Sequence, residues 1–150
     1  MPQKKKAKNS AFQLTFNHAM IYSRDVPAAL QFYGSVLGFK VLEEFEGHGT
    51  VVYARLKSPR GDCTIALHAV APGEKFHTGG VRLYFEIKDV ASFCKRLEAS
   101  GVKFSKPPNV MPWGWTHAYL DDPDGHEVSL YWAGAKRLKK GKTTLKLENA

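Results

Sequence analysis

Residues 21–41 read IYSRDVPAALQFYGSVLGFKV, and residues 85–104 read FEIKDVASFCKRLEASGVKF. Each stretch leaves the end of an apolar strand, passes through a basic residue, Asp and Val into a helical segment, and reaches a glycine before the next strand. The offset is 64 residues from Arg24 to Lys88 and 63 residues from Gly38 to Gly101. Because such a unit cannot bury its apolar face alone, the repeat predicts two paired modules with a pocket related by approximate symmetry.

The local pattern predicts the elements of each module. Asp25 and Pro27 suit the N-cap and first turn of a helix over 26–36, and Gly38 suits its end. This helix is expected between a strand at 14–22 and strands near 39–46, 50–57 and 63–70. The second module, 80–132, is expected to repeat the first, 11–70, so the fold class is α+β with two tandem βαβββ modules. Its elements are a strand at 81–87, a helix at 90–99, strands near 102–105, 114–120 and 126–132, and a stiff loop at 107–115.

The net charge of +8 is concentrated at the two ends of the chain. Residues 1–10 hold four Lys, and residues 136–150 hold six Lys or Arg and one Glu, whereas residues 11–135 hold 12 basic and 13 acidic residues. Ends so poor in apolar residues are typical of solvated tails around a single domain at 11–135. Neither tail interleaves aromatic residues for base stacking, so nucleic-acid binding is not expected.

The chain shows no sequence signal for a membrane or for secretion. No stretch approaches the roughly 20 apolar residues that span a bilayer. The first ten residues also lack the apolar segment of a signal peptide. We therefore expect a cytoplasmic protein.

Alternation along the strands predicts which side chains leave the core. In the strand at 81–87 the odd-numbered residues face the helix, and Arg82, Tyr84 and Glu86 face the other way. Aromatic walls with a few polar groups are the usual composition of a small-molecule site, in which Arg82 is suited to hold an anionic oxygen. The expected ligand-binding residues are His18, His68, Arg82, Tyr84, Glu86, Trp115, His117, Glu127, Ser129 and Tyr131.

Three motifs resemble the vicinal oxygen chelate superfamily, which includes glyoxalase I, extradiol dioxygenases, and fosfomycin- and bleomycin-resistance proteins. The motifs are Asn17-His18-Ala19, the segment 32–39 (FYGSVLGF) and the segment 121–130 (DDPDGHEVSL). The resemblance implies two βαβββ modules that form a curved mixed sheet around a cleft. In this family the cleft is commonly completed by dimerisation, so a homodimer is expected.

The resemblance also implies metal ligands on the first and last strands of each module. The corresponding positions hold His18, Ala66, Arg82 and Ser129, so only the histidine matches. A lone histidine cannot retain a catalytic divalent ion, because such sites need about three protein ligands. The sequence therefore favours a protein that binds a small aromatic or oxygen-bearing molecule with no assigned cofactor.

A displaced metal site is the alternative. His68 and Glu127 lie two residues from the family positions and on the same strand faces, and with His18 they would form a two-His, one-carboxylate set. Two residues along a strand span about 6.6 Å, so the site would have to shift within the cleft. This alternative predicts a lyase, isomerase or dioxygenase that uses Fe, Mn, Zn or Ni. The turn histidines His48, His77 and His126 are expected to be solvated.

Overall fold

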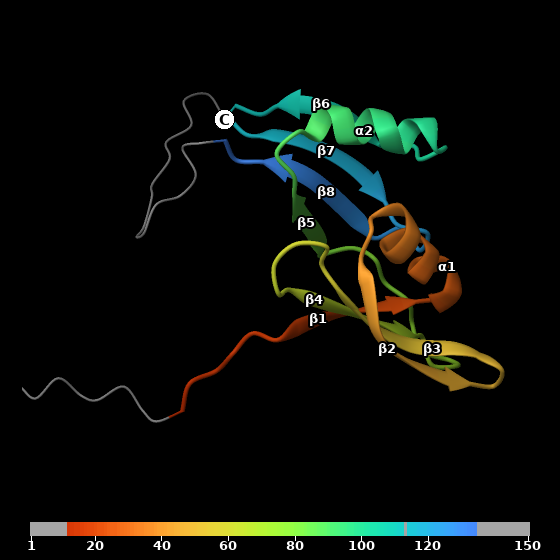
Figure 1. Cartoon of the computed structure of the whole chain (residues 1–150). Coiled ribbons are helices and arrows are strands. Elements are labelled where there is room, and N and C mark those ends of the chain that lie inside the picture. Colours follow the sequence, from red (N-terminus) through yellow and green to blue (C-terminus); the bar gives the residue numbers. More distant parts are fainter. Residues whose placement is uncertain (1–11, 113, 135–150) are drawn as a thin grey trace, which may run out of the picture.

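The computed structural model describes residues 12–112 and 114–134, which fold as two similar modules (Figure 1). Each module is a four-stranded mixed sheet, with the strand orders β1-β4-β3-β2 and β5-β8-β7-β6. In each sheet the first and last strands of the module pair in parallel, and the other neighbours pair antiparallel. The predicted pair of βαβββ modules is confirmed.

The first helical segment forms where the sequence predicts it. The Asp25 carboxylate accepts the N–H of Ala28 at 3.1 Å, and Pro27 lies in the first turn. The predicted strand at 14–22 begins only at His18, because β4 starts at Thr64, the residue opposite His18. The elements of this module are β1 (His18–Ser23), α1 (Val26–Leu30), the π-helix η1 (Gln31–Val36), β2 (Lys40–Gly47), β3 (Thr50–Lys57) and β4 (Thr64–Ala69).

The second module follows the prediction except at one edge strand. The prediction of a strand near 102–105 is wrong. The strand forms at 106–110, largely within the segment 107–115 that was expected to be a loop. There it pairs with β7 on either side of Pro107 and Pro108, which have no N–H to donate and are tolerated only at an edge. The elements are β5 (Arg82–Glu86), α2 (Val90–Ala99), β6 (Lys106–Val110), β7 (Thr116–Asp121) and β8 (Glu127–Trp132).

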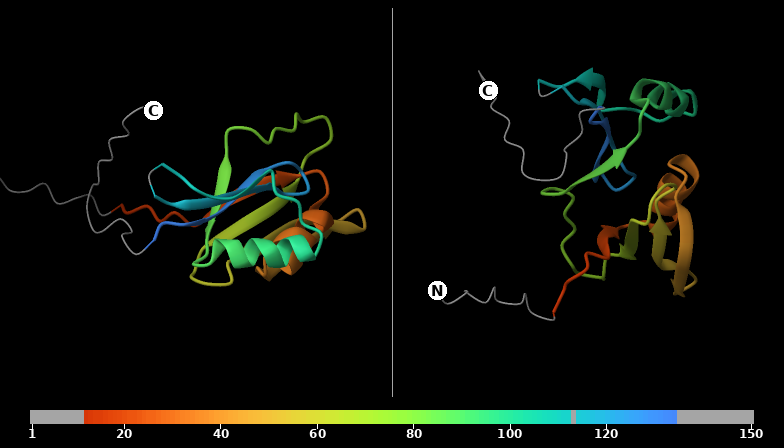
Figure 2. Two further views of the ribbon diagram at one scale, coloured as in Figure 1. Left: turned by 90° about the horizontal axis from the view of Figure 1, so that it is seen from above. Right: turned by 60° about the vertical axis from the view of Figure 1, so that its left-hand side comes forward.

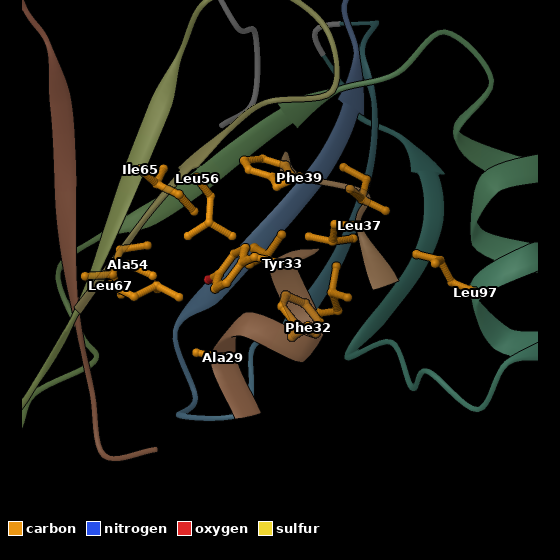
Figure 3. Packing of buried hydrophobic residues seen from close by; sticks show 14 of the residues in the cluster. Ala29, Phe32, Tyr33, Leu37, Phe39, Ala54, Leu56, Ile65, Leu67 and Leu97 are labelled. Atoms are coloured by element: carbon orange, nitrogen blue, oxygen red, sulfur yellow. The ribbon is translucent and has the colours of Figure 1, made fainter. Parts of the chain in front are cut away.

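One hydrophobic core joins the two modules around α1 and η1 (Figure 3). Tyr33 of η1 is fully buried, and its neighbour Phe39 contacts Phe85 of β5 at 5.1 Å between ring centroids. Figure 2 shows both helices on one side of the molecule and the linker between the modules on the other. The sheet faces that point away from this core are therefore left for a ligand or a partner.

Two further predictions concern the ends of the chain and the membrane. The predicted tails, 1–10 and 136–150, lie outside the described residues. Within residues 12–112 and 114–134, no helix combines the length and apolar character needed to cross a membrane.

Candidate functional site

The predicted site residues fall on two open sheet faces. Face A is the outward face of the first sheet, and face B is the outward face of the second. The exposed fractions of Tyr22 on face A and Tyr84 on face B are 45% and 48%, so solvent reaches both faces in a single chain. Face A carries His18 and His68, and face B carries Arg82, Tyr84, Glu86, Trp115, His117, Glu127, Ser129 and Tyr131.

Face B presents a row of nearly parallel rings. His117 lies between Trp115 and Tyr119, with ring centroids 6.3 and 5.7 Å away and interplanar angles of 18° and 10°. Across the strand pair, Tyr131 lies 5.6 Å from His117 at 21°, and Tyr84 meets both rings edge-on. His117 and Tyr119 are buried in this row, so the rings that a planar molecule could contact are the half-exposed Tyr84 and the partly exposed Trp115 and Tyr131.

His117, in the middle of this row, is held by Ser129 of the neighbouring strand. Both side chains are buried, and His117 Nδ1 lies 3.0 Å from the hydroxyl of Ser129. Burial lowers the pKa of His117, and the positive charge of Arg82 lowers it further. Ser129, one of the expected ligand-binding residues, is fully buried in the single chain, where its hydroxyl contacts His117.

Arg82 of face B is already paired with a carboxylate. The Arg82 guanidinium contacts Glu127 at 2.8 Å and lies over the Tyr119 ring, 4.7 Å from its centroid. The hydrogen bond to Glu127 raises the pKa of Arg82 above its ordinary value. The hydrogen bond to Tyr84 raises this pKa further, by a smaller amount. Arg82 and Glu127 therefore satisfy each other before any ligand arrives.

On face A, His18 is held by hydrogen bonds at both ring nitrogens. Its Nδ1 lies 2.6 Å from Asn17 Oδ1, and its Nε2 lies 3.2 Å from Arg55 Nη2. Because a guanidinium can only donate, Nε2 must accept and Nδ1–H must donate. His18 in this arrangement offers no free lone pair to a metal, and the nearest neighbour of Nε2 is itself a cation.

The second histidine of face A lies far along the sheet from the first. His68 is opposite Tyr22, four residues from His18 along β1, or about 13 Å. Its Nδ1 lies 2.6 Å from the backbone oxygen of Ala69. Within the described part of one chain, His18, His68 and Glu127 do not form a metal-sized cluster.

The cluster that does have metal-like proximity is Asp122, Asp124 and His126, whose ligand atoms lie within 4.8 Å of one another. All three are buried, so the expectation that His126 is solvated is wrong. Asp122 accepts the hydroxyl of Tyr33 at 2.8 Å, and the N–H groups of Asp124 and His126 at 2.9 Å. These bonds occupy both Asp122 oxygens.

The other two members of this cluster reach into the first module. Asp124 accepts the Ser23 hydroxyl and the Arg24 N–H, and His126 Nε2 lies 2.7 Å from the backbone oxygen of Tyr22. Burial raises the pKa of Tyr33 well above its ordinary range, and Asp122 raises it further. The cluster therefore acts as a polar joint between the modules, with its donors and acceptors already paired.

Two cavities in the described part of the chain are bordered by other residues than those of the predicted site. One of about 480 Å³ is bordered by Phe32 and by residues 102–105 and 121–123. Another of about 160 Å³ lies beside β1 and the linker, next to Tyr22 and His126. None of the ten predicted site residues lines either cavity, since these residues line the open faces instead.

Comparison with known protein families agrees with this two-module architecture. The Glyoxalase/Bleomycin resistance protein/Dioxygenase superfamily matches residues 15–130, which span both modules and the motifs quoted above. The chain belongs to this superfamily. Many members of the superfamily use divalent metals.

Relatives of this superfamily member carry different names. A probable lactoylglutathione lyase of Synechocystis is 26% identical, and the match covers 80% of this chain and 96% of the relative. A crystal structure of a superfamily member from Sphaerobacter thermophilus is 27% identical with a TM-score of 0.64, covering 79% and 97%. An antibiotic-binding protein from Streptomyces is 26% identical with a TM-score of 0.64, covering 79% and 96%.

Sequence reasoning missed Arg55 and the Asp122 joint. Alternation on β3 contained the first signal, since the buried Ala54 and Leu56 flank Arg55 and force it outward. The repeat also places Arg55 opposite Ala66, just as Tyr119 lies opposite Ser129. The joint carried no comparable signal, because its donors come from residues about 100 positions away in the sequence.

Proposed function

We propose that this superfamily member binds a small planar aromatic or oxygen-bearing molecule on face B, without a resident metal. The observation that carries the proposal is the group of accessible rings formed by Tyr84, Trp115 and Tyr131, which pack on the buried rings of His117 and Tyr119. Because the rings hold one another in place, a planar ligand would stack at little cost in side-chain entropy.

Two further observations support this proposal. The antibiotic-binding relative from Streptomyces resembles this chain over most of its length. In addition, the family's metal-binding histidine position, His18, is engaged by Asn17 and Arg55. A binding role uses both features, because it needs a rigid apolar surface and no Lewis acid.

We infer that the protein works as a cytoplasmic homodimer in which face A of one copy lies opposite face B of its partner. Met20, Tyr22 and Phe45 on face A are 43%, 45% and 57% exposed, and Tyr84 on face B is 48% exposed. Large apolar side chains gathered on one surface are typical of an interface. Light scattering should give a mass of twice the 16.7 kDa of one chain.

The test of the binding role is a titration with 2-naphthamide, a neutral planar probe, followed by calorimetry. We expect saturable binding that weakens about tenfold in Tyr84→Ala, because removing one aromatic contact costs roughly 1–1.5 kcal/mol. Val110→Ala is the matched control, since Val110 is also exposed but pairs with Thr116, whose side chain points away from face B. Equal affinities in both variants would contradict a site on face B.

A metal-dependent lyase, isomerase or dioxygenase is the second candidate. It is favoured by the curated relative named as a probable lactoylglutathione lyase. It requires that His18, His68 and Glu127 come together with Fe, Mn, Zn or Ni across two copies of the chain. Elemental analysis of the purified protein decides between the candidates. About one metal equivalent per chain that is lost in His18→Ala would replace the binding proposal with this one.

A further inference from the structure

Arg55 is a partly buried cation held only by neutral groups. From β3 its Nε donates to the Tyr53 hydroxyl at 3.2 Å, its Nη1 to Asn17 Oδ1 at 3.3 Å, and its Nη2 to His18 Nε2 at 3.2 Å. Each terminal nitrogen keeps a second N–H, because a guanidinium has five donors. Each of these remaining N–H groups can donate a charge-assisted hydrogen bond to a carboxylate.

Arg55 also lacks a carboxylate partner of its own. Within residues 12–112 and 114–134, the ion pairs involve Arg24, Lys57 and Arg82, and none of them includes Arg55. Glu43 lies opposite Arg55 in the β2–β3 register, but its carboxylate accepts the Tyr53 hydroxyl at 3.2 Å and makes no ion pair with the guanidinium. An anion brought by a ligand would therefore give Arg55 the direct charge-assisted contact that it lacks among the described residues.

In the described part of the chain, the second module, unlike the first, has a carboxylate in direct contact with its outward-facing arginine. The repeat equates His18 with Arg82 and Arg55 with Tyr119, so the cation and its ring neighbour have exchanged strands. On face B the cation is neutralised by Glu127 at 2.8 Å. The corresponding position on face A is Thr64, which has no charge. Among the described residues, the arginine of face A therefore has no direct ion pair, whereas the arginine of face B has one.

We propose that Arg55 binds the carboxylate of an aromatic carboxylate ligand, at the position where other family members would be expected to hold a metal. The proposal rests on the proposed function, because the ring of the same ligand would lie on face B of the partner copy. The ligand expected between Arg55 and face B of the partner copy is a planar ring with a carboxylate at its edge. Tyr53, in contact with Phe45 and His68, would border the carboxylate end.

The test compares 2-naphthoate with 2-naphthamide by calorimetry on the full chain. The probes have the same ring system and differ in charge. We expect the wild-type protein to bind 2-naphthoate about tenfold more tightly, since a charge-assisted bidentate pair contributes about 1.5–3 kcal/mol before ligand desolvation. Arg55→Gln should remove this preference and leave 2-naphthamide affinity unchanged. Arg55→Lys should keep part of it, because an ammonium is a point charge without the planar fork.

Lys57→Gln is the matched control, because Lys57 is another cation of β3 but is paired with Asp62 at 3.3 Å. The preference for 2-naphthoate should survive in this variant. Equal binding of the two probes by the wild-type protein would overturn the role of Arg55 and leave the aromatic binding role standing. Binding of neither probe would overturn both. Circular dichroism of the Arg55 variants separates a lost contact from a lost fold, and Arg55→Lys serves where Arg55→Gln does not fold.

Discussion

In the first module the turn at 58–62 is largely exposed, whereas the turn at 122–126, which holds the same place in the repeat, is largely buried. Both turns have a proline in their second position and a glycine with positive φ in their fourth, at 81° for Gly61 and 93° for Gly125. Pro59 and Gly61 belong to a turn that faces solvent. In the second module Asp122 and Asp124 bind donors from the first module. The repeat thus preserves the backbone, while the surroundings decide the role of the side chains.

The two faces differ in the same way. Each carries one arginine beside a ring, but Arg82 is neutralised by Glu127 and Arg55 is held by His18, Asn17 and Tyr53. Face B therefore has aromatic rings beside an arginine in an ion pair, and face A has an arginine held by hydrogen bonds to neutral groups. A cleft built from one face of each kind would hold a ring at one side and a carboxylate at the other.

The largest effect on the free energy of unfolding is expected from a substitution in the buried turn at 122–126. Asp122→Ala removes the acceptor of the Tyr33 hydroxyl and of two N–H groups, so the free energy of unfolding should fall by about 3 kcal/mol or more. Ser58→Ala, at the same place in the repeat, should change it by less than about 0.5 kcal/mol. Urea unfolding at pH 7 measures both. Equal losses would mean that the two turns contribute alike.

A smaller effect concerns the histidine buried in face B. Because burial lowers the pKa of His117, the unfolded chain takes up a proton below about pH 6.5 that the folded chain does not. The free energy of unfolding should therefore fall with pH below 6.5, by at most about 1.4 kcal/mol per pH unit. Urea unfolding between pH 7.5 and pH 5.5 measures this slope. In His117→Gln the slope should be shallower, and an unchanged slope would show that other groups cause it.

The smallest effect is expected from removing the carboxylate beside Arg82, so that the arginine of face B, like that of face A among the described residues, has no ion pair. Glu127→Gln leaves Arg82 without its carboxylate, but the side chains of both partners are about 40% exposed. The free energy of unfolding should fall by less than about 1 kcal/mol, and less still in high salt. Thermal unfolding at low and high salt measures the change. A loss above 2 kcal/mol would show that this pair is structural rather than a local charge balance.

Much of the fold could be predicted because it depends on local signals. Asp25 and Asp89 begin the helices, Gly38 and Gly101 follow their ends, and alternation correctly turns Arg82 and Tyr84 outward. The prediction failed where pairing with a distant strand decides the outcome. Residues 14–17 alternate like a strand, but the described pairing of β1 with β4 begins only at His18. The prolines of β6 are tolerated because that strand lies at an edge.

The sequence alone determined the family, the two modules and the composition of the faces, because helix caps, strand alternation and an internal repeat are short-range patterns. Only the tertiary structure decided which charges are satisfied. Glu127 forms an ion pair with Arg82, Asp122 accepts the Tyr33 hydroxyl, and Arg55 has no ion pair among the described residues although Glu43 lies opposite it. The physical reason is that an ion pair or a buried hydrogen bond depends on a few ångströms between side chains, which the register of the sheets and the packing of the modules set.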